Sequence, residues 1–393
     1  MMKNYKGIKI EIKPTIEQIE KINKTIGTGR FLYNFYIAYN KEIYEEEKRF
    51  VTGFEFSKYI NNVFIKENPD KSWIKDVSSK SNKQAIMNSE KAFKRFFNKI
   101  SGFPKFKKKS NNNQKCYFFK NNKTDFEFYR HKIKIPTLKF VRLKEYGYIP
   151  KNANIKSATI SKEGNRYFLS LILEMKKEIE NLISKKLESK EGIGIDLGIK
   201  DFATCSDGQV FKNINKTFKV RKIEKKLKKE QRKKSRKYLF CKKMEKNLYE
   251  CKNFQKQKLV IAKLFFKLNC IRNDYINKVI NMLTKTKLKY ITIEDLKVSN
   301  MIKNRHLSKA ISQQKFYEFR TKLLNKCKEK NIELRIVSTF YPSSKLCSNC
   351  GHKKQDLKLK DRIYKCCDCG LEIDRDYNAS LNLRNSTQYT ILT

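Results

Sequence analysis

Two closely spaced cysteine pairs constrain the fold of this chain more than any other feature of its sequence. Cys347 and Cys350 form the first Cys-x2-Cys pair, Cys366 and Cys369 form the second, and 15 residues separate the two pairs. This spacing is typical of a zinc ion held by four thiolates, a closed coordination shell that stabilises a fold and leaves no open position for catalysis. A glycine follows each pair and allows the tight turn that points both sulfurs at one ion. The sequence therefore predicts a structural zinc ribbon.

The second pair leaves one alternative open. Cys367 lies beside Cys366 and is another potential ligand, but two intervening residues are the better match, so we assign Cys366. His352, after the first pair, would be a redundant fifth ligand. The odd total of 11 cysteines and the absence of an apolar signal segment at the start indicate a reducing, cytoplasmic compartment. No stretch approaches 18 uninterrupted apolar residues, so we expect no membrane span.

The charge of the chain predicts a polyanionic partner. Lys and Arg number 90 against 40 acidic residues, which gives a net charge of +50. A bias from an AT-rich genome would favour lysine over arginine, but it would not favour bases over acids. An anionic membrane surface is the competing partner, but no amphipathic anchor with Trp or Leu facing a basic stripe is evident. Nucleic acid is therefore the expected partner.

The first 180 residues read as a β-module with a helical insertion. Residues 4–12 alternate apolar and polar side chains as in a strand, and residues 15–100 are helical with few breakers. Short strand-like runs follow at 116–119, 126–129, 138–143 and 158–160, and the last of these pairs with 167–173 as a hairpin. The charged, weakly patterned segment 176–190 reads as a linker.

The second half of the chain places three carboxylates at the ends of elements. Asp196 and Glu294 each end a short apolar strand, and Asp376 lies at the start of the helical segment 374–384. Long helices are expected between 214 and 286, a further helix at 308–330, and a third strand at 332–340. If the strands are parallel, the carboxylates meet at one sheet edge, where hard oxygen ligands suit Mg²⁺ or Mn²⁺. Two such ions about 4 Å apart activate a water and stabilise the leaving oxygen of a phosphodiester.

Each carboxylate motif alone has another interpretation. The Gly-Ile-Asp-Leu-Gly motif at 194–198 also occurs in the phosphate-loop strand of actin-like ATPases, and an Asp-Arg-Asp such as 374–376 is more often a helix cap than a ligand. The second Gly-rich loop and adenosine motif that such an ATPase needs are not found in the sequence. The order of the three motifs around a zinc ribbon in a basic chain is far more specific than any one of them.

Together these motifs give the chain a family resemblance. The motifs are the strand 5–14, Arg30-Phe-Leu-Tyr-Asn34, Ser157-Ala-Thr-Ile-Ser161, Gly194-Ile-Asp-Leu-Gly198 with Asp207-Gly208, Arg272-Asn-Asp-Tyr275, Ile293-Glu-Asp-Leu296, Pro342-Ser-Ser-Lys-Leu-Cys-Ser-Asn-Cys-Gly351 and Asp374-Arg-Asp-Tyr-Asn-Ala379. With these residues the chain resembles the TnpB family, RNA-guided DNA endonucleases of small bacterial and archaeal insertion sequences that are related to compact type V CRISPR effectors. The helix around 265–277 lacks histidines that relatives often carry.

The resemblance implies a multidomain α/β and α+β fold. The implied parts are a β-barrel-like wedge domain (1–14 and 101–180), a helical recognition domain (15–100), a RuvC/RNase H-like nuclease domain (190–342 and 373–386), an inserted zinc ribbon (343–372) and a tail (387–393). It also implies Asp196, Glu294 and Asp376 as the catalytic and magnesium-binding triad, with Asp374 in reserve for the third acid.

The resemblance further implies an RNA-guided, Mg²⁺-dependent endonuclease. It would bind a guide RNA from the transposon end and cleave double-stranded DNA beside a short flanking motif with a single RuvC-like site. We expect a monomer in a ribonucleoprotein, associated with the bacterial nucleoid. Lys225, Lys229, Arg232 and Lys233, on one basic helix, are candidates for lining the duplex, although a merely solvated helix explains them equally well. The alternatives in function are a nuclease-silent RNA-guided DNA-binding protein and a transposase or transposase accessory factor.

Overall fold

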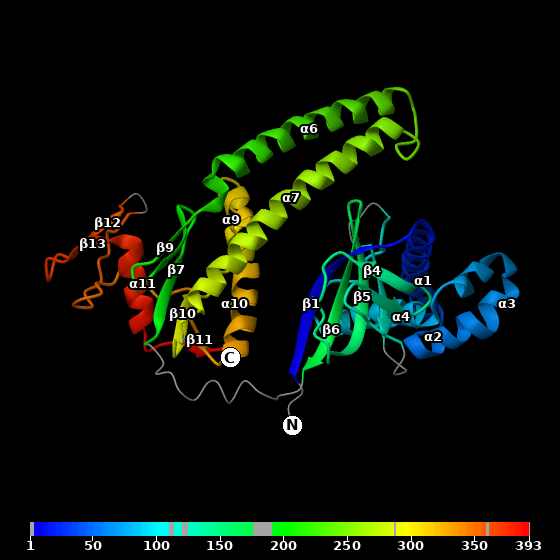
Figure 1. The fold of residues 1–393 in the computed structure, drawn as a ribbon, viewed down its shortest axis with the longest axis horizontal. Helices are drawn as coiled ribbons and strands as arrows, with labels where there is room; N and C mark the ends of the chain where they lie inside the picture. Colours follow the sequence, from blue (N-terminus) through cyan, green and yellow to red (C-terminus); the bar gives the residue numbers. More distant parts are fainter. Residues whose placement is uncertain are drawn as a thin grey trace. The chain divides into compact units, whose positions relative to one another are not determined.

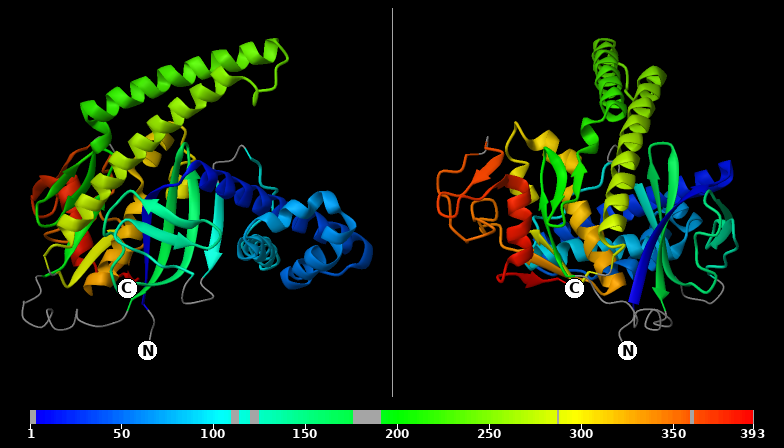
Figure 2. Two further views of the ribbon diagram at one scale, coloured as in Figure 1. Left: turned by 45° about the vertical axis from the view of Figure 1, so that its right-hand side comes forward. Right: turned by 60° about the vertical axis from the view of Figure 1, so that its left-hand side comes forward.

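The chain divides into two compact units, residues 1–180 and 181–393 (Figures 1 and 2). The computed structural model describes residues 4–109, 114–119, 125–175, 191–286, 288–358 and 361–392. The predicted linker at 176–190 lies outside these described residues. None of the described helices is both long enough and apolar enough to cross a membrane.

The first unit contains an antiparallel sheet with the strand order β2-β5-β6-β1-β4-β3. Its strands are β1 (Asn4–Lys13), β2 (Gln114–Phe119), β3 (Lys132–Ile135), β4 (Lys139–Leu143), β5 (Asn154–Glu163) and β6 (Arg166–Met175). The predicted hairpin is confirmed as β5 and β6, which pair from Asn154 with Glu174 to Glu163 with Arg166. Among the described residues the edge strands β2 and β3 each pair with one neighbour, so the sheet is open there.

One sequence prediction in this unit was wrong, and one strand was missed. Residues 126–129 form no strand: Phe128 makes only an isolated bridge to Ile133. The strand beside it, β3, was not predicted. Its four residues alternate lysine and isoleucine, and both isoleucines are buried in the core of the sheet. So short an alternation gives too little pattern to recognise.

The predicted helical insertion lies between β1 and β2. Its elements are α1 (Ile16–Glu47), α2 (Gly53–Tyr59), the π-helix η1 (Ile60–Phe64), α3 (Ile65–Glu67), the 3₁₀-helix η2 (Pro69–Asp76) and α4 (Ser79–Phe97). A capping box starts α1, because Thr15 accepts from the Gln18 amide while Gln18 accepts from the Thr15 amide. Aromatic side chains make the helical core, in which Tyr36 packs edge-on against Phe56 and donates to the Val51 carbonyl at 2.7 Å.

The second unit is built on a mixed sheet with the strand order β14-β11-β10-β7-β8-β9. Its strands are β7 (Ile193–Leu197), β8 (Asp201–Cys205), β9 (Val210–Lys212), β10 (Tyr290–Glu294), β11 (Glu333–Val337) and β14 (Thr390–Ile391). Strands β7, β10 and β11 are parallel, whereas β8, β9 and β14 run antiparallel to their neighbours. The order β9-β8-β7-β10-β11 with β8 reversed is that of the RNase H-like fold expected from the sequence.

Helices cover both faces of this sheet. They are the 3₁₀-helix η4 (Ile214–Lys216), α6 (Phe218–Lys243), α7 (Lys252–Leu283), α8 (Val298–Met301), α9 (Ser308–Gln314), α10 (Phe316–Lys330) and α11 (Arg375–Asn385). Apolar residues of α7 and α10 share one core with Ile193 and Ile195 of β7. Since side chains alternate along a strand, Gly194 faces the opposite side, where α11 packs (Figure 1).

The helix predicted at 308–330 is interrupted. Lys315 adopts a left-handed conformation with φ of 57° and separates α9 from α10. The Lys315 ammonium bonds Glu318 in the first turn of α10 and Asn273 of α7. These contacts stabilise a break that the apolar periodicity alone does not reveal.

Candidate functional site

Two neighbouring parallel strands bring Asp196 and Glu294 to the same sheet edge. Ile293 of β10 pairs with Ile195 of β7, and each carboxylate is the next residue along its strand. In sheets of this kind, sites form beyond the carboxyl ends of the strands. Both side chains are half-buried at that edge.

Helix α11 carries the third carboxylate to this edge. Gly194 allows the helix to lie directly on β7: a Cβ atom at this position would be 2.1 Å from the Ser380 carbonyl oxygen. Asp376 is in the first turn of α11, whereas Asp374 is its N-cap and accepts from the amides of Asp376 and Tyr377 at 2.9 and 3.0 Å. The Asp374 carboxylate is therefore engaged by the helix terminus, and the charge of Asp376 raises the pKa of Asp196 more than that of Asp374 does.

The three carboxylates form a site of net negative charge, which the nearby Arg375 offsets only in part. Burial raises the pKa of Asp196 well above its usual value, and the charges of Glu294 and Asp376 raise it further. Burial also raises the pKa of Glu294, against the opposing effect of a hydrogen bond from Ser343. Buried carboxylates in this arrangement favour either protons or a cation.

The three carboxylates are ligands of the kind that a hard divalent cation prefers, but their oxygen atoms are less closely grouped than the four cysteine sulfurs. Carboxylate oxygens are the ligands that Mg²⁺ and Mn²⁺ prefer. Among the described residues, only the four cysteines have three or more potential ligand atoms within 4.8 Å of one another, so the three carboxylates do not all lie within that distance of each other. Asp196, Glu294 and Asp376 would hold the divalent ions, which would supply activation of a water and stabilisation of a leaving oxygen.

The cysteine cluster contains the four residues predicted from the spacing. The Sγ atoms of Cys347, Cys350, Cys366 and Cys369 all lie within 4.8 Å of one another. Cys347 and Cys369 are 3.5 Å apart and Cys350 and Cys366 are 3.6 Å apart between sulfurs. Four sulfurs at about 2.3 Å from a tetrahedral zinc ion lie roughly 3.8 Å from each other, so this cluster can hold a metal such as zinc.

Two similar turns build the cluster. Gly351 and Gly370 both have positive φ, 76° and 74°, which is the conformation that glycine adopts most readily. Hydrogen bonds from the Asn349 side chain and the Leu371 backbone lower the pKa of the Cys369 thiol to about 6, in favour of the thiolate that binds metal. Cys367 points elsewhere, with its Sγ 3.2 Å from Nε2 of His352. The two short strands of the ribbon are β12 (Ile363–Lys365) and β13 (Glu372–Asp374).

Three buried residues that the sequence analysis did not select connect these parts. Ser343 donates to the Glu294 carboxylate. Asn378 of α11 donates to the Leu346 carbonyl at 2.7 Å and accepts from the Ser348 amide at 3.0 Å. Asn382, one turn later, donates to the Ser343 and Leu346 carbonyls. Ser343 and Asn378 lie within motifs that carry the family resemblance, and this membership was the only signal in the sequence for either residue.

The basic helix α6 forms a long antiparallel hairpin with α7 (Figures 1 and 2). Val220, Ile223 and Leu227 on α6 pack against apolar residues of α7. Lys225, Lys229 and Arg232 repeat at helical spacing on the opposite face and are exposed. Lys233 differs from them, since it lies on the flank and pairs with Glu230 at 3.0 Å.

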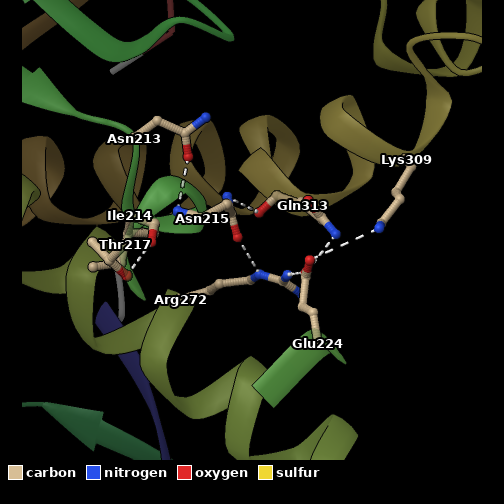
Figure 3. A network of polar contacts seen from close by, with 8 residues as sticks. All are labelled: Asn213, Ile214, Asn215, Thr217, Glu224, Arg272, Lys309 and Gln313. Atoms are coloured by element: carbon tan, nitrogen blue, oxygen red, sulfur yellow. Dashed lines mark hydrogen bonds and ion pairs between the residues drawn. The ribbon is translucent and has the colours of Figure 1, made fainter. Parts of the chain in front are cut away.

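A polar network fixes the base of this hairpin (Figure 3). Arg272 of α7 bonds Glu224 of α6 at 2.8 Å and the Asn215 side chain at 2.7 Å. Gln313 of α9 donates to the same Glu224 carboxylate at 2.6 Å, and Lys309 lies 3.8 Å from its other oxygen. Because the side chains of the central ion pair are only 13% and 21% exposed, this network ties the hairpin firmly to the unit that carries the sheet.

Fold and sites together define a mixed α/β protein with an RNase H-like sheet, a three-carboxylate edge and a four-cysteine ribbon. Three family models match parts of this chain: "Helix-turn-helix domain" at 1–49, "Probable transposase" at 170–305, and "Cas12f1-like, TNB domain" at 316–383. Within the first match the structure has strand β1 followed by the uninterrupted helix α1.

Relatives match over nearly the full chain. "Putative RNA-guided DNA endonuclease InsQ" of Escherichia coli (strain K12) is 28% identical and aligns over 97% of this chain and 92% of its own. "Putative RNA-guided DNA endonuclease" of Streptomyces pristinaespiralis is 28% identical over 98% of this chain and 90% of its own. These matches confirm the resemblance to the TnpB family that the motifs indicated.

A solved structure shares the fold. The Cas12f1 chain in "Cryo-EM structure of the Cas12f1-sgRNA-target DNA complex" aligns over 98% of this chain and 99% of its own, with a TM-score of 0.58 at 15% identity. At that identity the similarity concerns the fold alone.

Proposed function

We propose that the protein is an RNA-guided, Mg²⁺-dependent DNA endonuclease of a transposable element. The observation that carries the proposal is the convergence of Asp196, Glu294 and Asp376 on one edge of an RNase H-like sheet, where burial and mutual repulsion raise the pKa of Asp196. The names of the relatives and the +50 net charge support the same function.

In this proposal the domains keep the roles expected from the family. Residues 1–14 and 101–180 act as a wedge domain, residues 15–100 as a recognition domain, residues 190–342 and 373–386 as the nuclease, and residues 343–372 as a zinc-stabilised insertion. The open antiparallel sheet of the first unit and its helical insertion are consistent with the first two roles.

The three acids would hold the catalytic metal, and neighbouring residues would position them. A bound Mg²⁺ pair supplies activation of a water and stabilisation of the leaving oxygen of the phosphodiester. Ser343 orients the Glu294 carboxylate by its hydrogen bond, and Asp374 holds the first turn of α11 so that Asp376 faces the strands. The basic face of α6 would contact the backbone of the nucleic acid through Lys225, Lys229 and Arg232, at a place fixed by the network around Arg272.

A guide RNA would supply the sequence specificity. Pairing between guide and target reads the DNA, and the protein reads only a short flanking motif, as described for effectors of the Cas9 type. The proposed complex is one protein chain with one RNA, acting on double-stranded DNA at the nucleoid.

The decisive experiment compares Asp196→Ala with Asp274→Asn. Asp274 is an exposed carboxylate on α7 whose one ion pair among the described residues is with Lys278 of the same helix, so its variant controls for loss of a negative charge in this unit. With copurified RNA and a plasmid target, Asp196→Ala should abolish Mg²⁺-dependent cleavage and retain DNA binding. Cleavage that survives Asp196→Ala refutes the proposed site.

The same assay separates the two other functions. If the wild-type protein binds RNA-matched DNA but never cleaves it with Mg²⁺ or Mn²⁺, it is a nuclease-silent binder. If it joins DNA ends without any RNA, it is a transposase. Sequencing of the copurified RNA identifies the guide.

A further inference from the structure

A pocket in the first unit has no part in the proposed chemistry. It lies between helix α1 and the 3₁₀-helix η2, has a volume of about 470 Å³, and is lined by Lys24, Gly27, Arg30, Phe31, Trp73 and Asp76 among others. Arg30 and Phe31 begin one of the motifs on which the family resemblance rests, and no role for them has emerged so far. A volume in this range suits a small planar ligand with a polar substituent.

Two aromatic side chains form one wall of the pocket. The rings of Phe31 and Trp73 meet edge to face, with centroids 5.2 Å apart and an interplanar angle of 68°. In such a pair, the ring that contributes its edge keeps both faces free of the other ring. Trp73 is 37% exposed, although aromatic side chains of this size are usually well covered. An exposed aromatic face beside a pocket is a stacking platform for another planar group.

The charged residues of the pocket have no ionic partner among the described residues. Lys24, Arg30 and Asp76 form no ion pair in the part of the chain that the structure describes. Two cations beside an aromatic wall match a phosphate attached to a planar base, and one carboxylate matches the N–H groups of that base. A plain apolar ligand would leave all three charges unused.

Gly27 leaves open space on the side of α1 that faces the pocket. A Cβ atom built on this residue meets nothing within 4 Å, so the space above the helix at this position is empty. Glycine within a helix costs roughly 0.5–1 kcal/mol relative to alanine. A helical glycine with free space above it is costly to retain unless the space is used.

We propose that this pocket binds one unpaired nucleotide of the nucleic acid, with the base against the Phe31–Trp73 wall and the phosphate beside Lys24 and Arg30. The choice of ligand class rests on the proposed function. The recognition chemistry is shared by RNA and single-stranded DNA, because both offer a base and a phosphate. A base inside a duplex is already stacked on both faces, so a paired base should not reach the Phe31–Trp73 wall without being extruded.

Trp73 provides a direct test, because it is the only tryptophan of the chain. Its fluorescence in the full-length protein is titrated with a single-stranded RNA, a single-stranded DNA of the same sequence, a blunt DNA duplex and a free mononucleotide. A stacked base should quench the emission to saturation with either single strand, and the strand that quenches at lower concentration identifies the natural ligand. The proposal is overturned if a gel shift shows that single strands are bound while the Trp73 emission stays unchanged. It is also overturned if the duplex or the mononucleotide quenches the emission equally at the same concentration.

Two substitutions at Gly27 make the matched pair of variants. Gly27→Ala improves the helix and adds one methyl group to open space, whereas Gly27→Leu improves the helix as well and fills the pocket. Both variants should fold at least as stably as the wild type. Gly27→Leu should weaken single-strand binding by roughly 5- to 100-fold relative to Gly27→Ala, the effect of losing one stacked base. Equal affinities of the two variants refute the inference.

The failure of this inference and that of the proposed function give different results. A protein that cleaves with its guide, loses cleavage in Asp196→Ala, and shows no response at Trp73 keeps the proposed function and loses only the pocket. A protein that binds no RNA or DNA loses both.

Discussion

The close approach of α11 to β7 predicts that Gly194→Ala separates the third acid from the other two. The added Cβ would lie 2.1 Å from the Ser380 carbonyl oxygen and 2.4 Å from the Arg384 amide nitrogen, and real Cβ contacts are essentially never shorter than 3.0 Å. Both obstacles are backbone atoms of α11, so no side chain can rotate away. The helix must therefore move outward by about 1 Å.

The expected cost has two parts. Overpacking of this kind typically destabilises by about 1–3 kcal/mol, and in a unit of this size each kcal/mol lowers Tm by roughly 2–4 °C. Asp376 moves with the first turn of α11, and a misplacement of about 1 Å costs on the order of 100-fold in catalysis. We therefore expect a modestly less stable protein whose cleavage rate falls much further than its stability.

The assay measures cleavage of a guided plasmid target well below Tm, alongside a thermal melt. Gly7→Ala is the matched control, because Gly7 also lies within a strand but its Cβ would meet nothing within 4 Å. The control should keep both cleavage and Tm close to the wild-type values. If Gly194→Ala melts and cleaves like Gly7→Ala, the packing of α11 on β7 is wrong, and the argument that places Asp376 beside the strands fails with it.

Three further predictions concern the metals and the basic helix. The purified protein should contain about one zinc per chain; Cys369→Ser should lose the metal and lower Tm, whereas Cys367→Ser, outside the cluster, should retain it in metal analysis. Because burial raises the pKa of Asp196, ionising this residue in the folded protein costs stability. In EDTA, the Tm of the wild type should therefore fall relative to that of Asp196→Asn as pH rises from about 4 through the raised pKa, and Mg²⁺ should restore the Tm. A Tm difference that stays constant across pH contradicts the assignment. Replacing Lys225 and Lys229 together by alanine should lower the slope of log affinity against log salt by about 2, and an unchanged slope would mean that these lysines contact only water.

Local sequence patterns were sufficient where an element is long or its ligand spacing is fixed. The alternation in β1, the hairpin of β5 and β6, and the long helices α6 and α7 were all predicted because each extends over many residues. The four cysteines were predicted because the geometry of one metal ion determines their spacing. The strands β8 and β9 were not predicted, since neither carries an apolar run like those of β7 and β10, and β8 is placed by pairing with β7 and β9 by pairing with β8.

The carboxylate edge was predictable in part. Asp196 and Glu294 end apolar strands, and parallel strands place their carboxyl ends together, so a local pattern and one topological rule suffice. Ser343, Asn378 and Asn382 were not predictable, because their roles are hydrogen bonds between segments 30 to 50 residues apart in sequence. Only the structure reveals that the side chains of these three residues are buried.

The structure also gives a physical reason why a ribbon is inserted directly before the third acid. The ribbon begins at Ser343, which donates to Glu294, and its end leads into Asp374, which caps α11. Asn378 and Asn382 of α11 both donate hydrogen bonds to the carbonyl of Leu346, which directly precedes Cys347. A metal bound by the four cysteines therefore fixes both ends of the ribbon. One end positions Glu294 through Ser343, and the other positions Asp376 through the cap of α11. Loss of that metal should disorder the carboxylate edge even though no cysteine touches it.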